Sequence, residues 1–259
     1  MGERTEYKHG TFSWTDLTTT DQETAKKFYG ELFGWETTDN EVGEGVYYTM
    51  AELDGKAVAA ISPQPEQQRD AGVPPTWNSY ITVDSADDAL KRAKELGAEV
   101  HADAFDVMDV GRMGVIQDPQ GAFFLVWEPK AHIGASVVNT AGALAWNELA
   151  TPDLDASAEF YSELFGWETE QIEGMEMPYR VIKRQDGASN GGMRPTQENE
   201  PPYWLVYFGA DDIEGKVKQA TEREANTIVP PTDIGMGQIA VLQDPQGAVF
   251  ALFAGQFDE

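Results

Sequence analysis

The sequence of 259 residues contains no cysteine, which excludes disulfides, thiolate zinc sites and a cysteine nucleophile. Histidine is scarce as well, present only as His9, His101 and His132. With so little histidine, no Ser–His–acid triad is expected. No apolar run is long enough to cross a bilayer, and the polar start MGERTEYKHG does not resemble a signal peptide. We therefore expect a soluble cytoplasmic protein.

Basic residues are few: Lys and Arg total 18 against 45 Asp and Glu, for a formal charge of -27. A surface this acidic repels phosphate, so neither nucleic acid nor an anionic membrane is an expected partner. The charge favours solubility or adaptation to high salt, with a cationic partner as the alternative. The expected partner is a small-molecule ligand or substrate, and the chain is expected to be a monomer or homodimer.

Two sequence motifs occur twice in the chain. FYGELFGWE at 28–36 returns as FYSELFGWE at 160–168, and QDPQGAFF at 117–124 returns as QDPQGAVF at 243–250. The segments around them align without a gap between 11–36 and 143–168. An ordered set of repeats indicates a duplicated domain. We predict one domain at 8–129, a linker at 130–142 and a second domain at 143–256.

Each copy contains the order strand, helix and three strands, twice. A helix is predicted from about Asp21, with a capping box of Thr20 and Glu23 and a C-terminal stop at Gly34. Its apolar positions recur at helical spacing: Ala25, Phe28, Tyr29, Leu32 and Phe33. The fold class is therefore α+β, with four such modules, curved sheets and helices outside. The repeated nonapeptide is interpreted mainly as scaffold that packs a helix onto a sheet.

FYxELFGWE after a strand and Asp21, together with DPQGAxF near the end of each copy, resembles the glyoxalase/bleomycin-resistance/dioxygenase superfamily, also called vicinal oxygen chelate proteins. The resemblance covers both copies and implies a tandem member whose sheets curve around a cup. In enzymatic members a divalent metal, held by His, Glu or Gln, chelates two adjacent substrate oxygens. Members include isomerases, dioxygenases, thiol transferases and antibiotic-sequestering proteins, so the resemblance predicts the fold and leaves the reaction open.

The resemblance also places the metal ligands of the superfamily on this sequence. On the first strand of each copy they fall at Trp14 and Trp146, and on the last strand at Leu125 and Ala251. On the strand that opens the second module they fall at Asn78 and Leu205 or, if the register is one residue earlier, at Trp77 and Trp204. Indole and hydrocarbon side chains cannot ligate a metal, and neither register supplies a good ligand. No metal and no cofactor are therefore expected.

Alternation along the strands indicates which side chains line the cup. Phe12, Asp16 and Thr18 are expected on the face of Trp14, and Phe123 on the face of Leu125. Asp16 and its counterpart Glu148 are the candidate catalytic acids or polar anchors. The candidate ligand-binding residues are Trp14, Trp146, Asn78, Tyr80, Tyr207, Leu125, Trp127 and Phe253. The alternative, given equal weight, is that Trp14 and Trp146 fill the space left by the lost metal and close the cups.

Three functions fit these residues. The first is a metal-independent binding protein for an aromatic or amphipathic small molecule, as in the bleomycin-resistance type. The second is a glyoxalase- or dioxygenase-like enzyme, a lyase or oxidoreductase, with an off-pattern metal or with Asp16 or Glu148 as base. The third is a degenerate scaffold for protein contacts. Whether a cup combines modules of one copy or of both copies is left open by the sequence.

Overall fold

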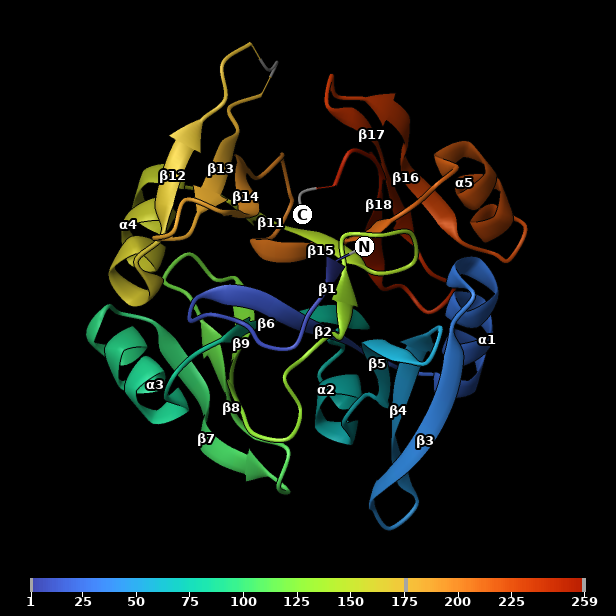
Figure 1. Cartoon of the computed structure of the whole chain (residues 1–259), viewed down its shortest axis with the longest axis horizontal. Coiled ribbons are helices and arrows are strands. Elements are labelled where there is room, and N and C mark those ends of the chain that lie inside the picture. Colours follow the sequence, from blue (N-terminus) through green and yellow to red (C-terminus); the bar gives the residue numbers. More distant parts are fainter. Residues whose placement is uncertain (1, 175–176, 258–259) are drawn as a thin grey trace.

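The computed structural model describes residues 2–174 and 177–257, and the chain folds into two curled sheets of eight strands each (Figure 1). The first sheet has the order β3-β4-β5-β2-β6-β9-β8-β7 and the second the order β12-β13-β14-β11-β15-β18-β17-β16. These orders are the same once equivalent strands are matched. The predicted α+β class and its four modules are confirmed, and each sheet combines the two modules of one copy.

The strands of the first sheet are β2 (Thr11–Thr19), β3 (Glu36–Gly43), β4 (Val46–Leu53), β5 (Lys56–Pro63), β6 (Thr76–Thr82), β7 (Glu99–Val107), β8 (Gly111–Gln117) and β9 (Phe123–Pro129). The strands of the second sheet are β11 (Leu144–Thr151), β12 (Glu168–Gln171), β13 (Arg180–Lys183), β14 (Ser189–Pro195), β15 (Tyr203–Gly209), β16 (Asn226–Asp233), β17 (Gly237–Gln243) and β18 (Val249–Gly255). The short strands β1 (Gly2–Glu3) and β10 (Val137–Val138) pair separately. The helices are α1 (Gln22–Phe33), α2 (Glu66–Asp70), α3 (Ala86–Glu95), α4 (Leu154–Phe165) and α5 (Ile213–Thr221).

The predicted capping box, with Thr20 as N-cap, would start helix α1 at Asp21, but the helix begins at Gln22. Asp21 is the N-cap, and its side chain accepts a hydrogen bond from the backbone N–H of Thr24, so the proposed pair of Thr20 and Glu23 is wrong. Asp153 caps α4 in the same way. The predicted stop at Gly34 is confirmed by its left-handed backbone, with φ of 76°.

The two sheets meet back to back through their central strands, and their concave faces point in opposite directions (Figure 1). Helix α1 lies beside α5 of the other domain, and α3 lies beside α4. The Tyr29 hydroxyl donates to Asp244 Oδ2 at 2.9 Å, and the Tyr161 hydroxyl donates to Asp118 Oδ2 at 2.8 Å. The repeated nonapeptide thus packs its helix onto both domains, which extends the predicted scaffold role.

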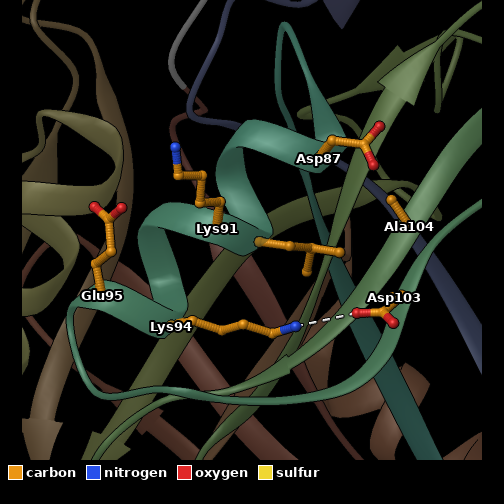
Figure 2. Close-up of a pocket in the computed structure, with 7 residues that line it drawn as sticks. Asp87, Lys91, Lys94, Glu95, Asp103 and Ala104 are labelled. Atoms are coloured by element: carbon orange, nitrogen blue, oxygen red, sulfur yellow. Dashed lines mark hydrogen bonds and ion pairs between the residues drawn. The ribbon is translucent and has the colours of Figure 1, made fainter.

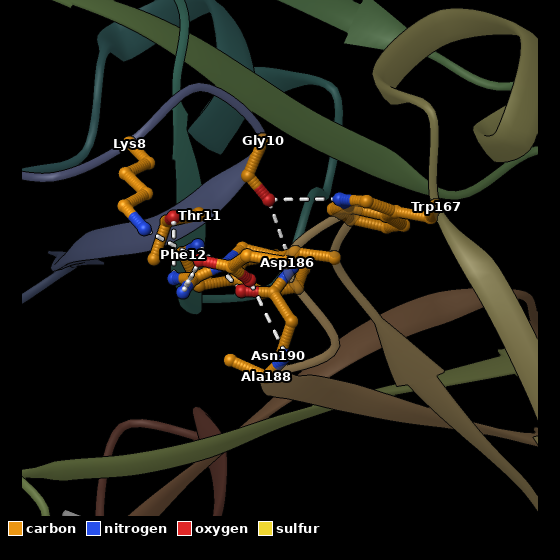
Figure 3. A network of polar contacts seen from close by, with 9 residues as sticks. Lys8, Gly10, Thr11, Phe12, Trp167, Asp186, Ala188 and Asn190 are labelled. Atoms are coloured by element: carbon orange, nitrogen blue, oxygen red, sulfur yellow. Dashed lines mark hydrogen bonds and ion pairs between the residues drawn. The ribbon is translucent and has the colours of Figure 1, made fainter.

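A second pair of contacts fixes the start of each domain. Trp167 Nε1 donates to the carbonyl of Gly10 at 2.8 Å, and Trp35 Nε1 donates to the carbonyl of Gly142 at 2.7 Å. Gly10 also accepts a bond from Asn190 Nδ2 at 2.8 Å, as Figure 3 shows. The Asn190 side chain in turn accepts from the Phe12 N–H at 3.3 Å. These contacts hold the two cups in a fixed relative position.

Within residues 2–174 and 177–257, no helix combines the length and apolar character needed to cross a membrane.

Candidate functional site

The first strand of each domain presents an indole and an acid to the hollow of its sheet. In β2 these are Trp14 and Asp16, and in β11 they are Trp146 and Glu148. A register shift between Phe12 and Trp14 interrupts the alternation of β2. Phe12 therefore packs against the other domain, with its ring 4.8 Å from that of Trp204, and the prediction that it faces the cup is wrong.

In the first domain, Asp16 is the centre of a closed network of neutral donors. Its Oδ1 accepts from Asn78 Nδ2 at 2.8 Å, and its Oδ2 accepts from the hydroxyls of Tyr80 at 2.7 Å and Tyr48 at 3.1 Å. Trp14 Nε1 donates to the Tyr48 oxygen at 2.9 Å. An indole, a phenol and a carboxyl thus form one hydrogen-bonded chain across what we call the first cup.

The second domain repeats this chain around Glu148 and adds a cation. Trp146 Nε1 donates to the Tyr179 oxygen at 3.0 Å, and Tyr179 and Tyr207 both hydrogen-bond the Glu148 carboxyl. Arg194 Nε donates to Glu148 Oε1 at 2.9 Å. We call this arrangement the second cup, and its guanidinium has no counterpart in the first.

Burial changes the acid–base properties of both cups. Desolvation raises the pKa of the Asp16 carboxyl, against the smaller lowering effects of Asn78, Tyr80 and Tyr48. Desolvation likewise raises the pKa of Glu148, although Arg194 opposes it. The pKa values of the four phenols that bond these acids are raised well above the usual value, first by burial and then by the neighbouring carboxylates: Tyr48, Tyr80, Tyr179 and Tyr207. The phenols therefore remain protonated donors at neutral pH.

The register of the strand that opens the second module is settled by its hydrogen bonds. Asn78 contacts Asp16, whereas the neighbouring Trp77 donates from Nε1 to the Tyr29 hydroxyl at 3.0 Å, on the opposite face. In the second domain Leu205 clusters with Tyr207 and Ala251, while Trp204 bonds Tyr161. The positions that face the cups are thus Asn78 and Leu205.

The last strand of each domain completes the walls. Leu125 and Trp127 of β9 are buried, and Trp127 Nε1 donates to the His132 carbonyl at 2.8 Å. Their counterparts in β18 are Ala251 and Phe253, and Phe253 is partly exposed. Phe123, which alternation places on the same face as Leu125, is 47% exposed and lies beside His101.

Several residues of the site escaped the sequence analysis. Tyr48 lies in β4, and its counterpart Tyr179 directly precedes β13; this repetition was a usable signal. Arg194 had none, because its counterpart in the first domain is Ser62. Its partner Glu200 lies in the loop after β14 and accepts from Nη1 at 2.7 Å and from Nη2 at 2.6 Å. His132 was assigned to the linker and reaches the first cup from there.

Another hollow lies on the outer surface beside α3, with a volume of about 390 Å³ (Figure 2). Its Lys94 and Asp103 side chains form an exposed ion pair at 3.1 Å. Arg112, which lies close by, pairs with Asp87 and does not reach a cup. Such solvated ion pairs contribute little to stability.

Comparison with known proteins is consistent with this architecture. The model of the Glyoxalase/Bleomycin resistance protein/Dioxygenase superfamily matches residues 11–126 and 142–252. The chain belongs to this superfamily. It is 44% identical to "Putative glyoxylase CFP32" of Mycobacterium tuberculosis over 255 residues, covering 97% of each chain. It is 32% identical to the anthracycline biosynthesis protein DnrV of Streptomyces peucetius, covering 96% of this chain and 94% of the relative.

Solved structures share the fold of this superfamily member at low identity. The Mn(II)-bound glyoxalase from Novosphingobium aromaticivorans has a TM-score of 0.66 and 14% identity, covering 100% of this chain and 86% of its own. The 2,2',3-trihydroxybiphenyl 1,2-dioxygenase from Sphingomonas wittichii has a TM-score of 0.66 and 11% identity, covering 96% of this chain and 92% of its own. At this identity the likeness concerns the fold alone.

The side chains of the two cups do not fit the metal that superfamily enzymes hold. The described part of the chain contains no group of three or more His, Asp and Glu side chains arranged to bind an ion. Each cup offers one buried carboxyl, and its oxygens already accept bonds from phenols and from Asn78 or Arg194. Divalent metals in such cups need several imidazole or carboxylate donors, so no chemical step is assigned to a metal here.

Proposed function

We propose that this chain binds a planar aromatic or amphipathic small molecule in a sheet cup, without a metal. The observation that carries the proposal is the repeated chain of indole, phenol and carboxyl: Trp14, Tyr48 and Asp16 in one cup, and Trp146, Tyr179 and Glu148 in the other. Indole and phenol rings offer flat apolar walls, and their polar atoms orient a ligand.

The relatives support a ligand of this class. A protein named for anthracycline biosynthesis is 32% identical over nearly the whole chain, and a second one is 31% identical. Anthracyclines are built on planar fused rings, which are able to stack on indole and phenol rings. We infer a fused-ring ligand, bound by stacking and by one or two hydrogen bonds.

Tryptophan fluorescence tests this function directly. The chain, dialysed against EDTA, is titrated with anthracene methanol, a neutral fused-ring probe. We expect saturable quenching that Trp14→Ala or Trp146→Ala removes, according to the cup that is occupied. No quenching up to the solubility limit of the probe, or quenching only after a divalent metal is added, would overturn the proposal.

The raised pKa values of Asp16 and Glu148 favour one alternative, an enzyme in which a buried carboxyl acts as general acid or base. The two functions differ in the fate of the bound molecule. A binding protein returns its ligand unchanged, whereas the enzyme converts it and loses turnover, with binding retained, in Asp16→Asn or Glu148→Gln.

A further inference from the structure

The two cups are covered to different extents. In the first, the segment after β9 brings the His132 imidazole edge-on to Trp14, with ring centroids 4.6 Å apart and planes at 87°. Trp14 and Trp127 are only 3% and 5% exposed. Burial lowers the pKa of His132, so a neutral imidazole occupies this place. In the second cup the equivalent Trp146 and Phe253 stay partly exposed.

The last strand of the second cup carries smaller side chains than the last strand of the first cup. Leu125 of the first cup is replaced by Ala251, and Trp127 by Phe253. Both changes shorten a side chain on the last strand. An incoming ring therefore meets an accessible indole at Trp146 in the second cup and a buried one at Trp14 in the first.

The polar groups of the second cup have their donors engaged within the protein. Arg194 donates from Nε to Glu148, from Nη1 to Glu200 and the Pro195 carbonyl, and from Nη2 to Glu200 and Tyr203. A guanidinium has five N–H groups, so all of them have acceptors. Trp146 donates to Tyr179.

The tyrosine hydroxyls of the second cup also lie beside acceptors of the protein. Tyr179 and Tyr207 bond the Glu148 carboxyl, and Tyr203 donates to Glu200 Oε1 at 3.1 Å. Lone pairs remain on the phenol oxygen of Tyr207 and on the Glu148 carboxylate, since a carboxylate has about four acceptor positions. The cup is thus rich in acceptors, and the N–H groups of Arg194 and Trp146 are all engaged within the protein.

The charged groups of the second cup also favour a ligand that donates hydrogen bonds. The second cup carries one cation, Arg194, and two carboxyl groups, Glu148 within the cup and Glu200 at its rim, whose ion pairs with Arg194 measure 2.9 Å and 2.6 Å. An anionic ligand meets two carboxyl groups and no free guanidinium N–H. A ligand with an ammonium, amide N–H or hydroxyl donor meets acceptors instead.

From the exposure of Trp146, the engaged donors and the carboxyl groups, we infer that the second cup is the ligand site of the chain. It selects a planar molecule whose polar edge donates hydrogen bonds. A cationic ligand binds more tightly than a neutral one, and a neutral ligand more tightly than an anionic one. This inference rests on the proposed function and adds to it the occupied cup and the chemical class of the ligand.

Three probes with one ring system test the selection. Anthracene methylamine is cationic near neutral pH, anthracene methanol is neutral and anthracene carboxylate is anionic. With the full chain in calorimetry, we expect one site per chain and that order of affinity, with the amine bound roughly tenfold or more tighter than the carboxylate. Tight binding of the carboxylate, or two equal sites per chain, would overturn the inference while the proposed function stands. Binding of none of the probes would overturn both.

Variants assign the preference to the second cup. Glu148→Gln is expected to reduce the ratio of amine to carboxylate affinity by roughly tenfold. Glu168→Gln, which removes the same charge from an exposed strand end, is the matched control and should leave the ratio unchanged. If Glu148→Gln does not fold, Glu200→Gln at the rim serves instead: it frees an Arg194 N–H and should tighten carboxylate binding. An unchanged ratio in whichever of these variants folds contradicts the assignment.

Discussion

At the scale of single residues, Asp16 and Glu148 occupy equivalent positions but have different electrostatic surroundings. Glu148 is paired with Arg194, whereas Asp16 has only the neutral donors Asn78, Tyr48 and Tyr80. An ionised carboxylate buried without a cation costs free energy that hydrogen bonds only partly offset. An ionised Asp16 in the first cup is therefore less favourable than an ionised Glu148 in the second.

The raised pKa of Asp16 has a measurable consequence. Its contribution to stability is present below the unfolded-state pKa of 3.8 and is lost as pH rises through the higher folded-state value. Asp16→Asn stays neutral at every pH, so its free energy of unfolding relative to wild type should be more favourable at about pH 7 than at about pH 4. Urea unfolding at both pH values measures this. Exposed Glu36→Gln is the control, and a constant or reversed difference for Asp16→Asn would contradict the account.

Gly192 tests the position of Tyr179 in the second cup. A Cβ at Gly192 would lie 2.0 Å from the Tyr179 hydroxyl, so Gly192→Ala must displace that ring from Glu148 and Trp146. The ring is the end of a mobile side chain, so we expect a stability loss of about 1 kcal/mol and a larger loss of probe affinity. Thermal unfolding and titration with anthracene methylamine separate the two. Unchanged affinity would show that Tyr179 is no part of the site.

At the scale of elements, the helices that carry the repeated nonapeptide join the domains. The Tyr29 hydroxyl accepts from Trp77 and donates to Asp244, and Tyr161 does the same between Trp204 and Asp118. Asp118 and Asp244 each also accept three backbone N–H bonds in their DPQG turns. The two repeated motifs therefore meet across the domain boundary.

Removing either phenol oxygen leaves a buried indole N–H and a buried carboxyl with one partner fewer. We expect Tyr29→Phe and Tyr161→Phe each to lower the free energy of unfolding by about 1–3 kcal/mol. The near symmetry of the contacts predicts similar losses for the two variants. Denaturant unfolding measures them, with the exposed Tyr47→Phe as control. A loss of unfolding free energy no larger than that of the control would show that these hydrogen bonds do not stabilise the fold.

Most elements followed from local patterns, and the departures have local causes. Helix α1 was predictable from its apolar spacing and Gly34, because those signals act within a few residues. The inward position of Trp14 followed from the resemblance and that of Asp16 from alternation. Alternation misplaced Phe12, because a register shift in β2 is not visible as a pattern. Arg194 was missed because neither repetition nor spacing marks a residue that only one copy carries.

At the scale of the whole molecule, the two domains share apolar cores. Phe28 and Phe33 of α1 pack against Phe250 and Phe208 of the second domain, and Tyr161 of α4 packs against Phe124 of the first. Burial that crosses the boundary stabilises both sheets together. We expect the domains to unfold as one unit.

Differential scanning calorimetry checks that cooperativity. The chain should show one transition whose calorimetric and van't Hoff enthalpies agree. Tyr29→Phe should lower its midpoint without splitting it. Two resolved transitions in the wild-type chain would mean that the shared cores contribute little and that each sheet is stable alone.

The most direct test of the central claim is the metal content of the purified chain after dialysis, measured by mass spectrometry beside a titration with anthracene methanol. The account predicts far less than one iron, manganese, nickel or zinc per chain and saturable binding of the probe by the same sample. A stoichiometric metal that survives dialysis, and whose removal abolishes probe binding, would contradict it.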